Sequence, residues 1–80
     1  MNPRVARVRP TDAHMLELVF TDGDHRRYDC SDLLDLGVFH ELRDIGYFKQ
    51  AKVLAGTVVW PNEQDICPDT LYVASSHSII

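Results

Sequence analysis

The chain has 80 residues, which is enough for one domain spanning residues 1–80, because a second core would need roughly 50 more. Its hydrophobic fraction of 45% and charged fraction of 25% are typical of globular proteins and argue against disorder. The formal net charge is −4 with acids and bases interspersed, so we expect no direct binding to nucleic acid.

Three strands are predicted at the start of the chain. Residues 4–9 form the first, and residues 14–20 and 24–29 form a β-hairpin. A type I turn with Gly23 in the left-handed region would add a bulge and pair Phe20 with Asp24. A two-residue loop would give the other register, but it would divide the apolar residues between two faces.

The bulged register places four apolar side chains on one face, which are Leu16, Leu18, Phe20 and Tyr28. Glu17 then lies opposite Arg27 on the other face, where we expect a cross-strand ion pair. Met15 and Val19 share this otherwise polar face. They are therefore candidate interface residues, to be covered either by a helix or by a second subunit.

Short helices and a second hairpin complete the predicted fold. A helical region follows residue 31, Asp44 caps another short helix, and residues 52–60 form a hairpin around Ala55-Gly56. Pro68 and Asp69 suit the first turn of a last helix. The order β-β-β-α-α-β-β-α predicts an α+β domain with an antiparallel sheet, a core at about 4–75 and a frayed tail at 77–80.

Motifs for catalysis, nucleotides or metals do not occur in the chain. The sequence contains neither a G-x-G-x-x-G motif nor a P-loop. The four histidines fall on separate predicted elements, so they do not form a cluster of metal ligands. Arg4, Arg7 and Arg9 form the densest basic segment, which we interpret as a solvated strand face. We therefore expect no cofactor, no metal and no catalytic residue, although the sequence leaves an enzymatic role open.

The expected location is the cytoplasm. No apolar run approaches about 18 residues, and Met-Asn-Pro-Arg does not resemble a signal peptide, so no membrane association is predicted. Cys30 and Cys67 are far apart in sequence and are expected to remain reduced.

The C-terminal third contains the candidate binding residues, which are Trp60, Asn62, Asp65, Asp69 and Tyr72. Aromatic and polar side chains on a loop that leaves a sheet can form a recognition surface. In the structural alternative, Trp60 closes the core, Asn62 and Asp65 satisfy loop amides, and Tyr72 packs on the sheet.

The order and spacing of several segments resemble the bacterial domain of unknown function family 2442. The segments are Phe20-Thr21-Asp22-Gly23, Tyr28-Asp29, Val38-Phe39 with Leu42, Phe48, and Trp60-Pro61-Asn62…Asp65-Ile66…Pro68-Asp69-Thr70-Leu71-Tyr72. The resemblance implies a small stand-alone α+β domain without an established activity. It also implies a gene beside that of another small protein, as in a toxin–antitoxin pair.

Together these observations favour a non-catalytic protein-interaction or regulatory domain, as one half of a two-gene toxin–antitoxin-like module. Its expected partner is another small protein, a second copy of the chain, or both. The alternative is a small-ligand or metal-binding domain, with or without catalysis, that uses the segment from Trp60 to Tyr72.

Overall fold

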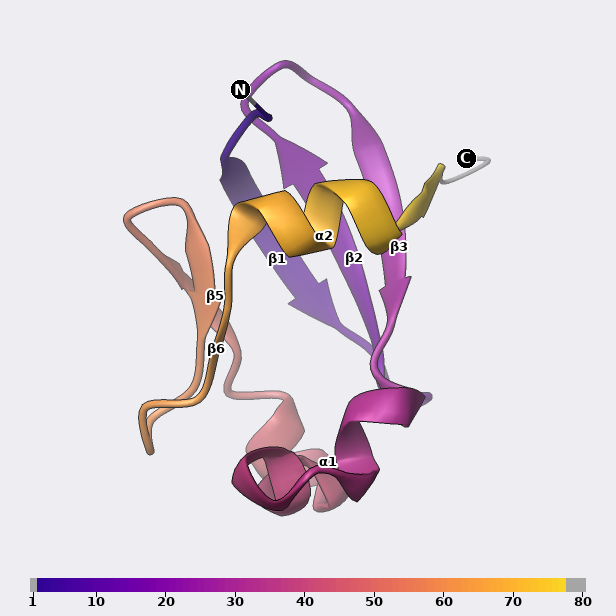
Figure 1. Cartoon of the computed structure of the whole chain (residues 1–80), viewed down its shortest axis with the longest axis vertical. Coiled ribbons are helices and arrows are strands. Elements are labelled where there is room, and N and C mark those ends of the chain that lie inside the picture. Colours follow the sequence, from indigo (N-terminus) through magenta and orange to yellow (C-terminus); the bar gives the residue numbers. More distant parts are fainter. Residues whose placement is uncertain (1, 78–80) are drawn as a thin grey trace.

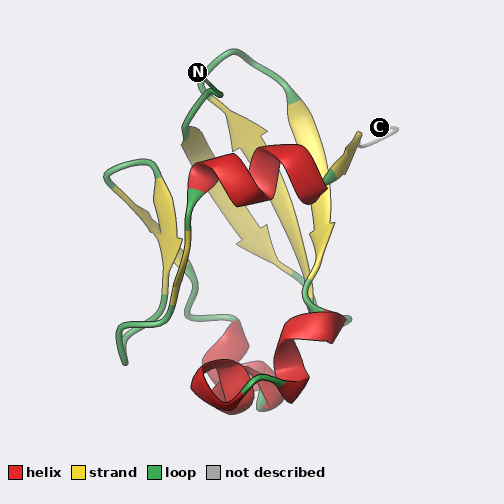
Figure 2. Ribbon diagram, viewed as in Figure 1, coloured by secondary structure: helices red, strands yellow, loops and turns green. Residues whose placement is uncertain are grey.

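A computed structural model describes residues 2–77, the side chain of His77 excepted. Two antiparallel sheets share the chain (Figures 1 and 2). The four-stranded sheet has the order β1-β2-β3-β7, with strands Val5–Pro10, Met15–Phe20, His25–Asp29 and Ser76–His77. The three-stranded sheet has the order β4-β5-β6, with strands Lys52–Leu54, Thr57–Val59 and Asp65–Ile66.

Short helices connect and cover these sheets. The 3-10 helices η1 (Ser31–Asp35) and η2 (Gly37–Arg43) and the single-turn helix α1 (Ile45–Phe48) lie between the sheets in sequence, and α2 is Pro68–Ala74. Strands and helices are segregated and every strand pairing is antiparallel, which confirms the predicted α+β class. The two hairpins, however, belong to separate sheets.

The predicted hairpin register is confirmed. Leu16 pairs with Tyr28 and Glu17 with Arg27. The amide of Phe20 donates to the carbonyl of Asp24 at 2.9 Å, and Gly23 has a φ of 87°. The apolar face of this hairpin therefore points into the core.

The expected ion pair between Glu17 and Arg27 is wrong. Arg9 Nε donates to Glu17 Oε1 at 3.0 Å instead. Because β2 is the strand between β1 and β3, Glu17 has a cross-strand neighbour on each side, and Arg9 lies opposite it on β1. The hairpin considered alone offered only one of these two neighbours.

Helix α2 lies across one face of the four-stranded sheet and buries that face (Figure 1). Leu71 is fully buried, and the ring of Tyr72 meets the ring of Phe20 edge-on at 5.0 Å between centroids. Pro68 occupies the first turn of α2 and Asp69 supplies its negative charge, as predicted. The core extends into the second sheet through Val58, Trp60 and Ile66.

The tip of the second hairpin joins the two sheets. Ala55 and Gly56 both have positive φ, at 53° and 81°, as a tight two-residue hairpin turn requires. The carbonyl of Gly56 accepts a hydrogen bond from the amide of Val5 at 3.0 Å, and the carbonyl of Ala55 accepts one from Arg4 at 3.3 Å. This contact fixes the first strand against the second sheet.

The predicted tail at 77–80 lies mostly outside the described residues. The backbone of His77 pairs with Arg26, which makes β7 the outer neighbour of β3. Residues 78–80 are not among those that the structure describes.

Candidate functional site

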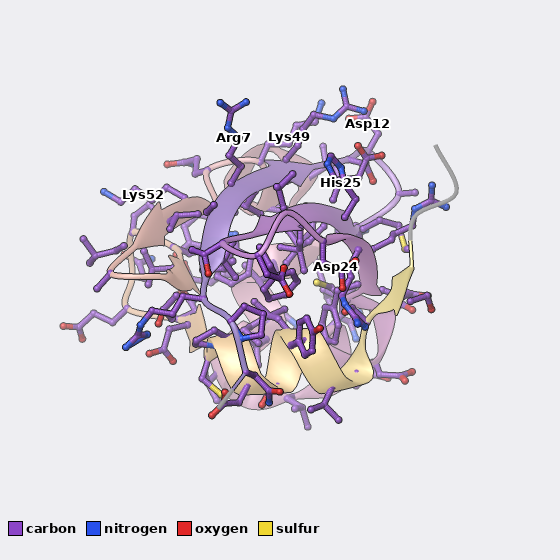
Figure 3. All side chains as sticks on the ribbon, turned by 90° about the horizontal axis from the view of Figure 1, so that it is seen from above. Arg7, Asp12, Asp24, His25, Lys49 and Lys52 are labelled. Carbon is purple, nitrogen blue, oxygen red and sulfur yellow. The ribbon has the colours of Figure 1, made fainter. Side chains whose placement is uncertain are left out.

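The four-stranded sheet has a second face, opposite α2, which we call the outer face. Side chains alternate across a strand, so the neighbours of the buried residues on β1, β2 and β3 point outward. They are Arg7, Arg9, Met15, Glu17, Val19, His25, Arg27 and Asp29. Figure 3 shows Arg7 and His25 on the side of the molecule away from α2, where no described helix covers the sheet.

A β-bulge in β1 brings the two arginines of that strand to the outer face. The register shifts between Val5, which pairs with Phe20, and Arg7, which pairs with Val19. Val5 therefore points into the core, whereas Arg7 and Arg9 point outward. Without the extra residue, strict alternation would place Val5, Arg7 and Arg9 on the same face.

Cross-strand pairing arranges the outer face in two rows. The first row runs from Arg7 through Val19 to His25. The second runs from Arg9 through Glu17 to Arg27. Met15 follows on β2 and pairs with Asp29. The central strand therefore presents an apolar, an acidic and an apolar side chain, with basic neighbours beside Val19 and Glu17 and an acidic one beside Met15.

The outer face is hollowed beside Val19, where a depression of about 360 Å³ is lined by Val19, Glu17 and His25 together with Arg7 and Arg9. A second depression, of about 580 Å³, is lined by Met15, Arg27 and Asp29 together with Tyr28 of the inner face and Ala74 of α2. Met15 and Val19 thus each border a recess in which a partner's side chain could bury them.

The charges of the outer face are only partly neutralised. Glu17 accepts from Arg9, whereas the guanidinium groups of Arg7 and Arg27 have no hydrogen bond or ion pair within residues 2–77. Lys49 and Asp12 form an ion pair at the rim, where Figure 3 shows them beside each other. The face therefore retains uncompensated positive charge.

Among the candidate binding residues, Trp60 and Tyr72 make contacts inside the protein. Trp60 is 2% exposed, and its indole N–H donates to the carbonyl of Phe48 at 2.9 Å. The guanidinium of Arg26 stacks on the ring of Tyr72, 3.9 Å from its centroid, and donates to its carbonyl. These contacts match the structural alternative for both residues, and a binding role for them stays a prediction.

Asn62 belongs to a hydrogen-bond network that the sequence did not reveal. Its amide donates to Tyr47 Oη at 2.9 Å, and its side chain donates to Glu41 Oε2 at 2.7 Å. The buried Gln64 donates to the other oxygen of Glu41 and accepts from Tyr47 at 2.5 Å. No sequence pattern marks Gln64, because its partners lie 17 and 23 residues away.

Asp65 and Asp69 are both exposed. Asp65 lies on β6 and borders a depression of about 340 Å³ whose other walls include Phe39, Ile66 and Cys67. Asp69 lies in the first turn of α2. A binding role for either residue stays a prediction.

The two thiols lie in opposite environments. Burial raises the pKa of Cys30 to about 12, whereas a hydrogen bond with the hydroxyl of Thr70 lowers the pKa of the exposed Cys67. Across the described part of the chain, no three His, Cys, Asp or Glu side chains are placed to hold a metal ion together. None of the helices there has the length and apolar character needed to cross a membrane.

Comparison with known protein families gave one match. The family described as "Protein of unknown function (DUF2442)" matches residues 5–77, which confirms the resemblance indicated by the sequence. Neither the curated proteins nor the solved structures contain a match.

Proposed function

Because the chain belongs to the DUF2442 family, whose description gives no function, we propose its role from its own surface. It is a non-catalytic protein-interaction domain that binds another protein through the outer face of the four-stranded sheet. We further propose that it acts in the bacterial cytoplasm as the regulatory half of a two-gene, toxin–antitoxin-like module. The observation that carries the binding role is the position of Met15 and Val19 on a sheet face that no helix within residues 2–77 covers.

The arrangement suits an interface with an apolar centre and a polar rim. Met15 and Val19 lie on the central strand and are only half-buried. Val19 pairs with Arg7 and His25, and Met15 pairs with Asp29. Protein interfaces are enriched in arginine and methionine, and polar groups at the rim exclude water from the apolar centre. A domain of this size has a small core, so cover over this face would also add stability.

Co-expression with the product of the neighbouring gene tests the proposal, with complex formation measured by size-exclusion chromatography and light scattering. Val19→Asp should abolish the complex, because it places a carboxylate in the apolar centre. Val73→Asp is the matched control, since Val73 is 75% exposed on α2, away from the outer face. Separate elution of the two wild-type proteins would contradict the proposal, as would equal effects of the two substitutions.

A small-ligand role is the second candidate, favoured by the depression beside Asp65. That depression combines the apolar walls of Phe39 and Ile66 with a carboxylate. Thermal shift against metals and metabolites tests it, since a ligand at 100 times its Kd adds about 2.7 kcal/mol. Asp65→Ala should remove such a shift without lowering the melting temperature of the free protein.

A further inference from the structure

We infer that the partner presents acidic side chains to the outer face, so that the site is a receptor for an acidic protein segment. This inference rests on the proposed function and names the chemistry of its partner. Its basis is the local charge. The chain carries a net charge of −4, yet its outer face gathers three arginines, Arg7, Arg9 and Arg27, against two carboxylates, of which Glu17 is bonded to Arg9 and Asp29 to Ser31.

Two of these arginines are available to a partner. Arg7 and Arg27 lie on the strands that flank β2, and neither has a polar partner within the described residues. Neighbouring strands are about 4.8 Å apart, so the backbones of β1 and β3 that carry the two arginines run on either side of β2 at roughly 10 Å from each other. A segment laid along β2 could pair a carboxylate with each while its apolar residues meet Met15 and Val19.

The same charges argue against a second copy of the chain as the partner. In a two-fold dimer the outer face would meet itself, so the arginines of one copy would approach those of the other. Each copy would bring two carboxylates, and both already accept hydrogen bonds, Glu17 from Arg9 and Asp29 from Ser31. Like charges placed opposite each other oppose association, so this face selects a different, acidic chain.

Nucleic acid also fits the face poorly. Sheets that bind single strands stack bases on aromatic rings, and the outer face of β1, β2 and β3 carries no Phe, Tyr or Trp. The apolar centre, Met15 and Val19, would be buried only by a partner that has apolar side chains of its own.

A titration of the ¹⁵N-labelled chain, followed by NMR, tests the inference. The probe is a short synthetic peptide of alternating Glu and Leu, and the matched peptide has Lys in place of Glu. The Glu peptide should shift the amide signals of β1, β2 and β3 outer-face residues, and its affinity should fall as salt rises to about 0.15 M. The Lys peptide should leave these signals unchanged.

Substitutions identify the arginines involved. Arg7→Gln and Arg27→Gln should each weaken binding of the Glu peptide, and the double variant should lose about tenfold in affinity. Lys52→Gln is the matched control: it removes one positive charge from an exposed position on β4, which belongs to the three-stranded sheet. The spectrum of each free variant verifies that it is folded.

Four outcomes would overturn the inference: no binding of the Glu peptide, equal binding of the Lys peptide, an equal loss in Lys52→Gln, or tighter binding of a DNA duplex that depends on Arg7 and Arg27. If Val19→Asp still abolishes the complex with the co-expressed protein while Arg7→Gln/Arg27→Gln leaves it intact, only the acidic character of the partner is refuted. If neither change affects that complex, the proposed function falls as well.

Discussion

Replacing Gly56 with alanine should destabilise the protein more than the same change at Gly23 or Gly37. A Cβ at position 56 would lie 2.7 Å from Cβ of Arg4 and 2.9 Å from its Cδ, and the backbone there has a φ of 81°. Gly23 also has a positive φ, of 87°, but nothing lies within 4 Å of its added Cβ. Gly37 has neither constraint. Comparing alanine at the three positions therefore separates the cost of backbone strain, present at Gly23 and Gly56, from the cost of crowding, present only at Gly56.

The expected magnitudes follow from these differences. A left-handed conformation costs an alanine about 1–2 kcal/mol, and crowding in a packed site adds about 1–3 kcal/mol. We expect losses of about 3 kcal/mol for Gly56→Ala and about 1 kcal/mol for Gly23→Ala, with little change or a small gain for Gly37→Ala. A domain of this length has a free energy of unfolding of about 4–12 kcal/mol, so the first loss is large.

Urea unfolding followed by far-ultraviolet circular dichroism measures these values from the transition midpoints at constant slope. Arg4→Gly removes the side-chain atoms that the new Cβ would meet. In the Arg4→Gly background, the cost of Gly56→Ala should therefore fall to about that of Gly23→Ala. Equal losses for Gly56→Ala and Gly23→Ala in the wild-type background would refute the contact between β1 and the second hairpin.

Three further predictions concern individual side chains. In the folded protein a thiol reagent should modify Cys67 quickly, because Cys67 is exposed and its pKa is lowered. Cys30 should react only on unfolding, because burial shields its thiol and raises its pKa. Fast reaction of both thiols in the folded protein would contradict this. The hydrogen bonds that Asp29 accepts from Ser31 lower its pKa, so its contribution to stability is complete above about pH 4 and is lost as the pH falls through the folded pKa. Ser31→Ala removes the hydroxyl bond and keeps the bond from the backbone amide, so it should raise this pKa in an NMR titration; an unchanged value would show that the hydroxyl bond does not form in solution. Tyr47→Phe removes the hydroxyl that donates to the side-chain oxygen of the buried Gln64, so it should lower the free energy of unfolding by about 1–3 kcal/mol, measured by thermal unfolding. A loss below about 0.5 kcal/mol would show that water or another group replaces the hydroxyl as the partner of Gln64.

The hairpin between β2 and β3 could be predicted from sequence because its information is local. Gly23 restricts the turn, the turn determines the register, and alternation then assigns Leu16 and Leu18 to the core. Asp44 was likewise predictable as a helix cap, and its carboxylate accepts from the amide of Gly46 at 3.0 Å. Strands β6 and β7 were missed because two residues carry no recognisable period.

The candidate site could be predicted only in part. Met15 and Val19 followed from the hairpin register, whereas the basic residues around them depend on the bulge in β1 and on pairing between strands. The odd spacing of Val5 and Val8 was the available signal, since both contact the core and strict alternation would place them on opposite faces. The Gln64 network left no signal, because it depends on the tertiary meeting of η2, α1 and a loop.

The position of Trp60 gives the protein an internal optical reporter. It is the chain's single tryptophan, and its indole is buried against Phe48 and bonded to that residue's carbonyl, where the α1 turn meets the second sheet. Its fluorescence therefore reports the docking of the second sheet, whereas circular dichroism averages over all elements. Coincidence of the two signals during refolding would show that both sheets form in one cooperative step, and a lag in the fluorescence would show that the second sheet docks last.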